Sequence, residues 1–318
     1  MLTTFMDATM KRTEFFLLQS IFASLFLTLI SIESYAQVEV QDAQTVLLAN
    51  TLFDEAMDGE NRPAIDALLD SEFSWVFPDG SYYSRSDALV TLPETALSKT
   101  GETVSVVERV YGRVRALEVS SGLVRALRIW VLRAEGWRLL HINELVKRVE
   151  PEGGPGPYRP AFRDTVPVPT CENPCESVPY VPVTQRSRDA LLSWQQQEIG
   201  GHTMDMDLWG AYVTDDWVGQ RAGGQRNPKA RRIALTNRRK ENGVSASAQA
   251  TVLQMRLYDL EDAVLMVSLT QGLRGRPEYR TRIFVHDGMR ADGGPLYKMA
   301  ESYGQIVVGT PVFGREQN

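Results

Sequence analysis

The stretch "SEFSWVFPDGSYYSRSDAL", residues 71–89, carries three local signals in immediate succession. The aromatic run at 73–77 is typical of a strand, and Pro-Asp-Gly at 78–80 ends it with a tight turn. Ser84 and Asp87 then have the spacing of a helix capping box. The stretch therefore predicts a strand that turns at once and enters a short helix.

The N-terminal segment has the organisation of a secretory signal peptide. Lys11 and Arg12 precede the 18-residue, mainly apolar run "FFLLQSIFASLFLTLISI", and Ser34 and Ala36 supply small residues at the expected cleavage site. An uncleaved membrane anchor is the alternative, since the run approaches the length of a membrane span. We expect residues 1–36 to be removed near Ala36 and the protein to be secreted or periplasmic, with no stable membrane insertion afterwards.

The charge of the chain argues against a nucleic-acid partner. The formal net charge is −6, and removing residues 1–36, which hold two basic and three acidic side chains, leaves −5. The rest of the chain is long enough for two domains that each bury a core.

A proline-rich segment at 151–185 divides the chain. It contains nine of the sixteen prolines, which predicts an extended, semi-rigid linker rather than a packed element. The expected domains are 37–150 and 186–312, with a tail at 313–318. Both cysteines, Cys171 and Cys175, lie in the linker; a local disulfide is the simplest interpretation after export, and two free thiols are the alternative.

The second half repeats the pattern of the first. Each half begins with amphipathic helices and ends with long β-rich runs separated by turn residues. In this comparison Trp217-Val218 corresponds to Trp75-Val76, and Asn227 begins a helix where Ser84 does. In the first helix the spacing predicts an inward face of four residues: Leu48, Leu52, Phe53 and Ala56.

This pattern resembles the nuclear transport factor 2-like superfamily, and within it the SnoaL-like polyketide cyclases and small exported proteins of that fold. The resemblance covers residues 42–149 and, more loosely, 186–308. It implies an α+β fold of two cone-shaped domains, each a curved antiparallel sheet wrapped around N-terminal helices. Such a cone encloses an apolar pocket.

Catalytic candidates follow from strict alternation along "WRLLHIN". Alternation places His141 and Asn143 on one face of the last strand, and the resemblance implies that this face lines the pocket. His141 could act as a general acid or base, with Asp79 or Glu108 as an orienting partner. The catalytic set would be His141 with Asp79 or Tyr83. The alternative is a structural histidine. The pocket aspartate of the cyclases has no counterpart here.

The ligand-binding candidates are pocket aromatics and polar groups expected from both halves. They are Trp75, Phe77, Arg128, Trp130, Asn143, Trp217 and Glu301. We expect no cofactor and no metal, because the spacing of His202, Asp205 and Asp207 fits no structural zinc pattern.

Two functions are open at this point. The first is a binding protein for a small apolar or amphipathic molecule, or an assembly module that pairs through its sheets, within the chain or as a homodimer. The second is a small-molecule cyclase, isomerase or dehydratase that uses His141. A basic cluster at 226–240 predicts a solvated helix, with an anionic partner as the alternative.

Overall fold

The computed structural model describes residues 45–95, 97, 104–146, 171–220, 226–243, 250–272 and 277–307. The chain divides into two compact units, Met1–Asp54 and Glu55–Asn318, and both β-sheets lie in the second. The expected signal peptide and the C-terminal tail lie outside the described residues. In the described ranges, no helix combines the length and the apolar character needed to cross a membrane.

The first half forms the elements that residues 71–89 predict. Ser84 and Asp87 make a complete capping box at the start of α3, and Gly80 adopts a φ of 86° in the preceding turn. The elements of this half are α2 (Arg62–Leu68), β1 (Leu69–Val76), β2 (Tyr82–Ser84), α3 (Arg85–Thr91), β3 (Ser105–Tyr111), β4 (Val114–Ser121), β5 (Val124–Arg133) and β6 (Gly136–Val146).

The helix at residues 45–58 forms as expected, but its buried face differs from the predicted one. Phe53 is fully buried, whereas Leu48 and Leu52 are 57% and 44% exposed. Val46 and Ala49 are buried instead, because together with Phe53 they form the continuous stripe of an α-helix.

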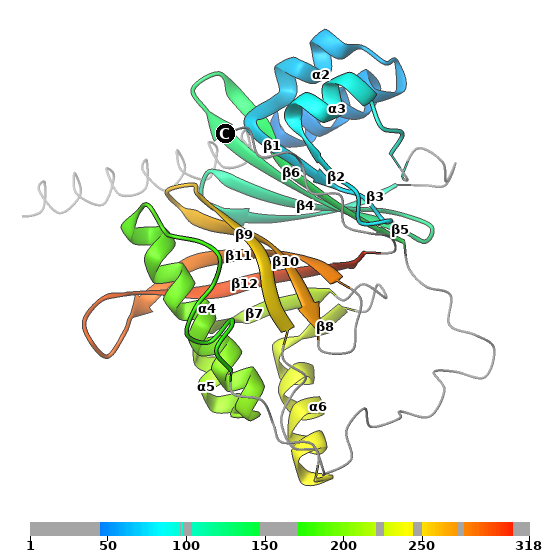
Figure 1. The fold of residues 1–318 in the computed structure, drawn as a ribbon. Helices are drawn as coiled ribbons and strands as arrows, with labels where there is room; N and C mark the ends of the chain where they lie inside the picture. Colours follow the sequence, from blue (N-terminus) through cyan, green and yellow to red (C-terminus); the bar gives the residue numbers. More distant parts are fainter. Residues whose placement is uncertain are drawn as a thin grey trace, which may run out of the picture. The chain divides into compact units, whose positions relative to one another are not determined.

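The second half repeats the same order of elements. These are α4 (Gln185–Thr203), α5 (Met206–Ala211), β7 (Val213–Gln220), β8 (Arg226–Pro228), α6 (Lys229–Glu241), β9 (Ala250–Asp259), β10 (Ala263–Gly272), β11 (Pro277–Met289) and β12 (Pro295–Ile306). Figure 1 shows α4 lying along the second sheet.

The two six-stranded sheets have identical topology, which confirms the α+β class and the two-sheet organisation. Their strand orders are β2-β1-β6-β5-β4-β3 and β8-β7-β12-β11-β10-β9. The sheets are mixed rather than purely antiparallel, because β1 pairs in parallel with β6 and β7 with β12.

Strand register aligns the halves residue by residue. In the first half Ser74 pairs with His141, and in the second Val218 pairs with Glu301. In both halves the preceding pair lies five residues earlier in one strand and two residues earlier in the other, so the register shift is the same. Glu301 therefore occupies the position of His141.

The register corrects another part of that comparison. Continuing it places Gly219, not Trp217, at the position of Trp75. The start of the second short helix moves as well, since Pro228 rather than Asn227 is the residue that precedes α6.

The two faces of each sheet belong to different cores. In the second half, helix side chains such as Trp194 and Trp209 pack with sheet residues such as Met266 and Phe284. The opposite faces of the two sheets share a core. Its residues include Ala116, Leu127, Ile129, Leu145, Tyr258, Leu265, Val267, Ile283 and Tyr303.

The end of the expected linker is packed, in contrast to the sequence expectation. Asn173 donates its amide to the carbonyl of Val252 and accepts from the Val252 amide, both at 3.0 Å. Val178 and Tyr180 pack against the helix-covered core of the second half. Cys171 and Cys175 form the expected disulfide.

Candidate functional site

A β-bulge in β6 decides which side chains reach the helix-covered face. Trp130 pairs with Leu139 and Ile129 with His141, so β6 has one extra residue at this point. Strict alternation fails there, because a bulge reverses the faces that follow it. The prediction that His141 and Asn143 point towards the helices is therefore wrong; both face the other sheet.

His141 is fully buried in a hydroxyl-rich cluster between the sheets. Its Nδ1 lies 2.8 Å from Ser74 Oγ, and its Nε2 lies 2.8 Å from Thr281 Oγ1. Asn143 donates to the same threonine oxygen at 3.0 Å, and Tyr258 OH lies 3.5 Å from Ser74 Oγ. Burial lowers the pKa of His141 to about 3, so the ring is neutral at physiological pH.

The structure does not bring the three catalytic candidates together. Asp79 is an exposed turn residue whose carboxylate accepts from the Ser81 amide at 2.8 Å. Tyr83 pairs with Trp75 in β2, on the helix side of the sheet and away from the histidine. Glu108, the other expected partner, forms a 3.1 Å ion pair with Arg115.

In the first half, aromatic side chains fill the helix-covered face. Trp75 and Trp130 are 1% and 0% exposed, and Phe77 stacks on Trp75 with ring centroids 4.7 Å apart. Arg128, on the same face of β5 as Trp130, is 1% exposed. Four of the predicted ligand residues therefore share one face, and they form a core there.

The second half places a buried guanidinium on the equivalent face. Arg282 corresponds to Arg128 in the register and is 3% exposed. Its Nη1 donates to Ser268 Oγ at 2.9 Å, and its guanidinium carbon lies 5.2 Å from the ring centre of Trp194. Burial lowers its pKa to about 10, which leaves the group charged at neutral pH.

The carboxylate nearest to Arg282 is only weakly engaged with it. Glu198 on α4 lies 3.8 Å from the guanidinium, while the same oxygen accepts from Trp194 Nε1 at 2.9 Å. Two residues along β11, Arg280 forms a 2.7 Å ion pair with Glu278. The pair Arg280–Glu278 is therefore satisfied, whereas Arg282 makes one side-chain hydrogen bond within the described residues, to Ser268.

Two positions on the face that carries Arg282 differ from those of the first half. Gly219 replaces Trp75, and Phe284 replaces the larger Trp130. The ring of Trp217 occupies the space that a Cβ on Gly219 would take. Within the described residues, the buried Nε1 of Trp217 has no hydrogen-bond partner, nor does the buried hydroxyl of Ser193 on α4.

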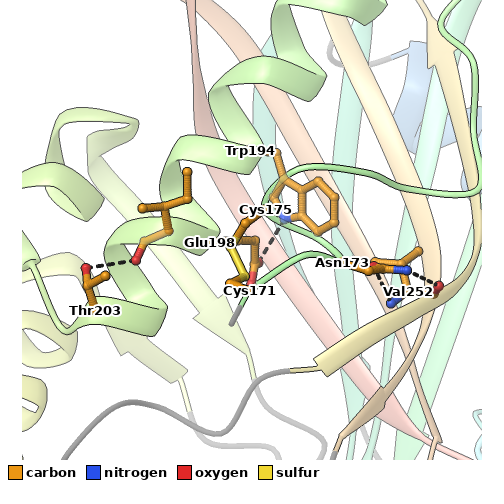
Figure 2. Close-up of a disulfide and its surroundings, with 8 residues drawn as sticks. Cys171, Asn173, Cys175, Trp194, Glu198, Thr203 and Val252 are labelled. Atoms are coloured by element: carbon orange, nitrogen blue, oxygen red, sulfur yellow. Dashed lines mark hydrogen bonds between the residues drawn. A yellow bond between two sulfur atoms is a disulfide. The ribbon is translucent and has the colours of Figure 1, made fainter. Parts of the chain in front are cut away.

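The disulfide lies beside this face. Figure 2 shows Cys171–Cys175 next to Trp194 and Glu198 on α4. The segment that carries the disulfide is held to β9 by the Asn173–Val252 pair of hydrogen bonds. The disulfide thus fixes a loop against the two α4 residues that contact Arg282.

Glu301 lies between the sheets rather than on the helix-covered face. Its side chain is 13% exposed, and one oxygen lies 3.3 Å from Arg109 Nε. The Nη2 of the same arginine lies 2.7 Å from Asp216 Oδ2. Burial raises the pKa of Glu301 to about 7, although Arg109 acts in the opposite direction. Its second carboxylate oxygen and the hydroxyl of Tyr303 are buried without partners among the described residues.

The acidic residues near His202 have a structural role. Asp205 caps α5 by accepting from the Leu208 amide at 3.0 Å. Among the described residues, no group of three or more histidine, cysteine or acidic side chains is arranged to hold a metal ion.

Comparisons with known proteins gave matches among solved structures. No protein-family model matches the chain, and no curated protein matches it. The chain is similar to solved NTF2-like structures. A protein of unknown function from Rhodospirillum rubrum is 13% identical, with 37% of this chain and 98% of that chain covered and a TM-score of 0.30. An NTF2-like protein from Cytophaga hutchinsonii is 14% identical, with 39% and 99% covered and a TM-score of 0.30.

A third likeness is to ActVI-ORFA from Streptomyces coelicolor. It is 14% identical, with 39% of this chain and 98% of that chain covered and a TM-score of 0.28. These names agree with the resemblance stated from the sequence. Each of these likenesses covers less than half of this chain.

Sequence reasoning missed Arg282, Glu198 and Ser268. Arg282 stands in "EYRTRIFV", where Arg280 and Arg282 alternate with residues of the opposite face. Arginine at two alternating positions of a β-rich run was the available signal. Glu198 lies four residues after Trp194, a spacing that brings both to one side of α4.

Proposed function

We propose that this protein binds a small amphipathic molecule on the helix-covered face of its second sheet, and that Arg282 receives an anionic group of that molecule. The first half has Trp75 and Trp130 at the positions of Gly219 and Phe284, and this proposal places no ligand there. A small-molecule-binding role is compatible with the two-sheet α+β fold, which by itself does not select a ligand.

The observation that carries this proposal is the buried Arg282, whose one side-chain hydrogen bond within the described residues goes to Ser268. Removing a guanidinium from water costs several kcal/mol unless partners replace the lost hydration. The Ser268 hydroxyl and the Trp194 ring supply part of that replacement, and Glu198 at 3.8 Å is too distant for a hydrogen bond. A ligand carboxylate placed against the guanidinium would supply the remaining hydrogen bonds. The apolar body of the ligand would then lie against Trp217 and Phe284.

Dodecanoate is a suitable probe. Dodecanol, which has the same chain without the charge, and acetate, which has the charge without the long chain, are the matched controls. We expect saturable quenching of tryptophan fluorescence by dodecanoate, because Trp194 stacks on Arg282, and at least tenfold weaker binding of dodecanol and acetate. Arg282→Met should abolish the difference between acid and alcohol. Arg128→Met, the equivalent change in the first half, should leave it intact.

Glu198→Gln sharpens the test. Removing the nearby carboxylate takes away the competitor for the guanidinium, so dodecanoate should bind several-fold more tightly. If neither Arg282→Met nor Glu198→Gln changes dodecanoate affinity, the ligand does not use this face and the proposal is wrong.

We also propose that the two halves pair through their sheets within one chain, in place of a homodimer. Support comes from the shared apolar core and from polar contacts such as His141–Thr281 and Arg109–Asp216. Light scattering should then show a monomer whose mass is independent of concentration, and a stable dimer would contradict the proposal.

The catalytic alternative has less support. A cyclase, isomerase or dehydratase using His141, Asp79 and Tyr83 needs these groups at one place, and they lie apart. The test is turnover of a screened substrate by His141→Ala and by His141→Gln, which preserves the fold. If His141→Ala loses turnover and His141→Gln retains it, His141 does not act as a base. Loss in both variants, with an unchanged melting temperature, would restore the catalytic hypothesis.

Export also stands as a proposal, supported by the charge, apolar run and small residues of the first 36 positions. N-terminal sequencing of the protein recovered from the secreted or periplasmic fraction should begin at Gln37. A full-length N-terminus in the membrane fraction would instead identify an anchor.

A further inference from the structure

Helix α6 concentrates positive charge on an otherwise acidic chain. Its 13 residues, Lys229–Glu241, include six basic side chains and one acidic side chain. The helix therefore carries +5, while the whole chain carries −6. Only Thr236 is buried, so most of the helix is in contact with solvent.

Part of this charge is used within the protein. Lys229 at the start of the helix contacts Asp215 at 2.9 Å and the Val213 carbonyl at 3.0 Å. These contacts hold the first turn of α6 against β7. Neither Arg231 nor Arg238 takes part in these contacts.

The outward face of α6 is a stripe with the order arginine, leucine, arginine. Arg231, Leu235 and Arg238 are spaced four and three residues apart, which places them on one side of a helix, and all three are exposed. Leu235 is 40% exposed, and the small, exposed Ala234 lies beside it. Within the described residues, neither Arg231 nor Arg238 has an acidic partner.

We propose that this face of α6 docks on an anionic lipid surface. Basic residues are attracted to the negative potential of such a surface, at about 1 kcal/mol or about fivefold in binding per residue. An exposed leucine between two arginines can insert among the headgroups while the guanidinium groups contact phosphates. The rest of the acidic chain is repelled by the same surface, which orients the protein with α6 towards the lipid.

A lipid surface fits the chain better than a nucleic acid does. The net acidic charge and the expected export both oppose a nucleic-acid partner. The apolar N-terminal run brings the chain to a membrane during export, whether or not it is later removed. A soluble polyanion is therefore an outcome of the test rather than a second proposal.

The full chain allows a probe to be placed on the helix itself. The sequence has two cysteines, and both are in the disulfide. Ala234→Cys therefore supplies a single thiol for an environment-sensitive fluorophore, and Arg188→Cys on α4 supplies a label at another exposed position. Emission is measured with phosphatidylserine–phosphatidylcholine vesicles, with pure phosphatidylcholine vesicles and with heparin.

We expect a blue shift at position 234 with the anionic vesicles alone, and none at position 188. Arg231→Gln with Arg238→Gln should weaken the response by about 25-fold, the product of two fivefold steps. Arg62→Gln with Arg188→Gln makes the same charge change elsewhere and should leave the response at position 234 nearly unchanged.

Three results would overturn the proposal. No shift at position 234, or an equal shift with neutral vesicles, would show that α6 does not contact anionic lipid. A shift with heparin but not with vesicles would assign the helix to a soluble polyanion. Since dodecanoate binding depends on Arg282 and not on α6, either proposal can fail without the other.

Discussion

Replacing Glu301 by glutamine removes a titrating group between the two sheets with little change of shape. In the folded protein its carboxylate lies 3.3 Å from Arg109 Nε. Asp216, Glu118 and Arg226 also act on it electrostatically, but burial is the largest influence and raises its pKa from 4.5 to about 7. Folding therefore favours the protonated form of this carboxyl group.

The sign and size of the effect follow from linkage. A carboxyl group whose pKa is raised in the folded state stabilises the fold at low pH, and this contribution is lost as the pH rises from 4.5 through 7. One pKa unit corresponds to about 1.4 kcal/mol, so the full effect is about 3 kcal/mol, of which about 2.5 kcal/mol falls between pH 5 and pH 8. Glu301→Gln removes that pH dependence.

The assay is urea unfolding followed by tryptophan fluorescence at pH 5 and pH 8, with the disulfide kept oxidised. Between pH 5 and pH 8 the wild type should lose about 2.5 kcal/mol of unfolding free energy that Glu301→Gln does not lose. All other titrating groups, His141 included, are common to both proteins and cancel in this difference.

Glu72→Gln is the matched control. Glu72 forms an inter-sheet ion pair with Arg256 at 3.1 Å, but both side chains are 51% exposed. Its pH profile should follow that of the wild type. Parallel profiles for wild type and Glu301→Gln would refute the account of Glu301 as a buried carboxyl group.

Three further predictions concern other elements. His141 has a pKa lowered from 6.5 to about 3 by burial, so the wild type should lose unfolding free energy as the pH falls from 6.5; His141→Gln should remove about 3 kcal/mol of that loss by pH 4.5, measured by urea unfolding. Cys171→Ser with Cys175→Ser opens a short loop and should lower the unfolding free energy by about 2 kcal/mol. Reduction should lower the stability of the wild type by the same amount and leave the double variant unchanged. Ser84→Ala removes the cap of α3 and should cost about 1 kcal/mol, while Ser84→Asp, which can still cap, should recover most of it in thermal unfolding.

The two halves share a framework and differ in the side chains at equivalent positions. Between the sheets, His141 is replaced by Glu301, so a buried neutral ring in one half corresponds to a carboxyl group that favours protonation in the other. On the helix-covered face, Trp75 is replaced by Gly219. The proposal that a ligand binds in the second half rests on these differences.

The sequence alone predicted the elements that local physical chemistry determines. The capping box at Ser84, the turn before it and the hairpin turns depend on residues close together in the chain, and all of them form. The Cys171–Cys175 disulfide is equally local. The internal repeat could be predicted because hydrophobic periodicity survives changes in individual residues.

The site depended on features that are not local. One extra residue in β6 reversed the faces of His141 and Asn143, and no residue type in "WRLLHIN" signals that bulge. Likewise, Arg282 gains its surroundings from Ser268 on β10 and from Trp194 and Glu198 on α4. Register between strands and the packing of a helix on a sheet are set by contacts across long sequence separations. Sequence patterns thus determined which segments become helices and strands, whereas the tertiary structure alone decided which side chains meet, because a shift of one residue exchanges the two faces of a strand.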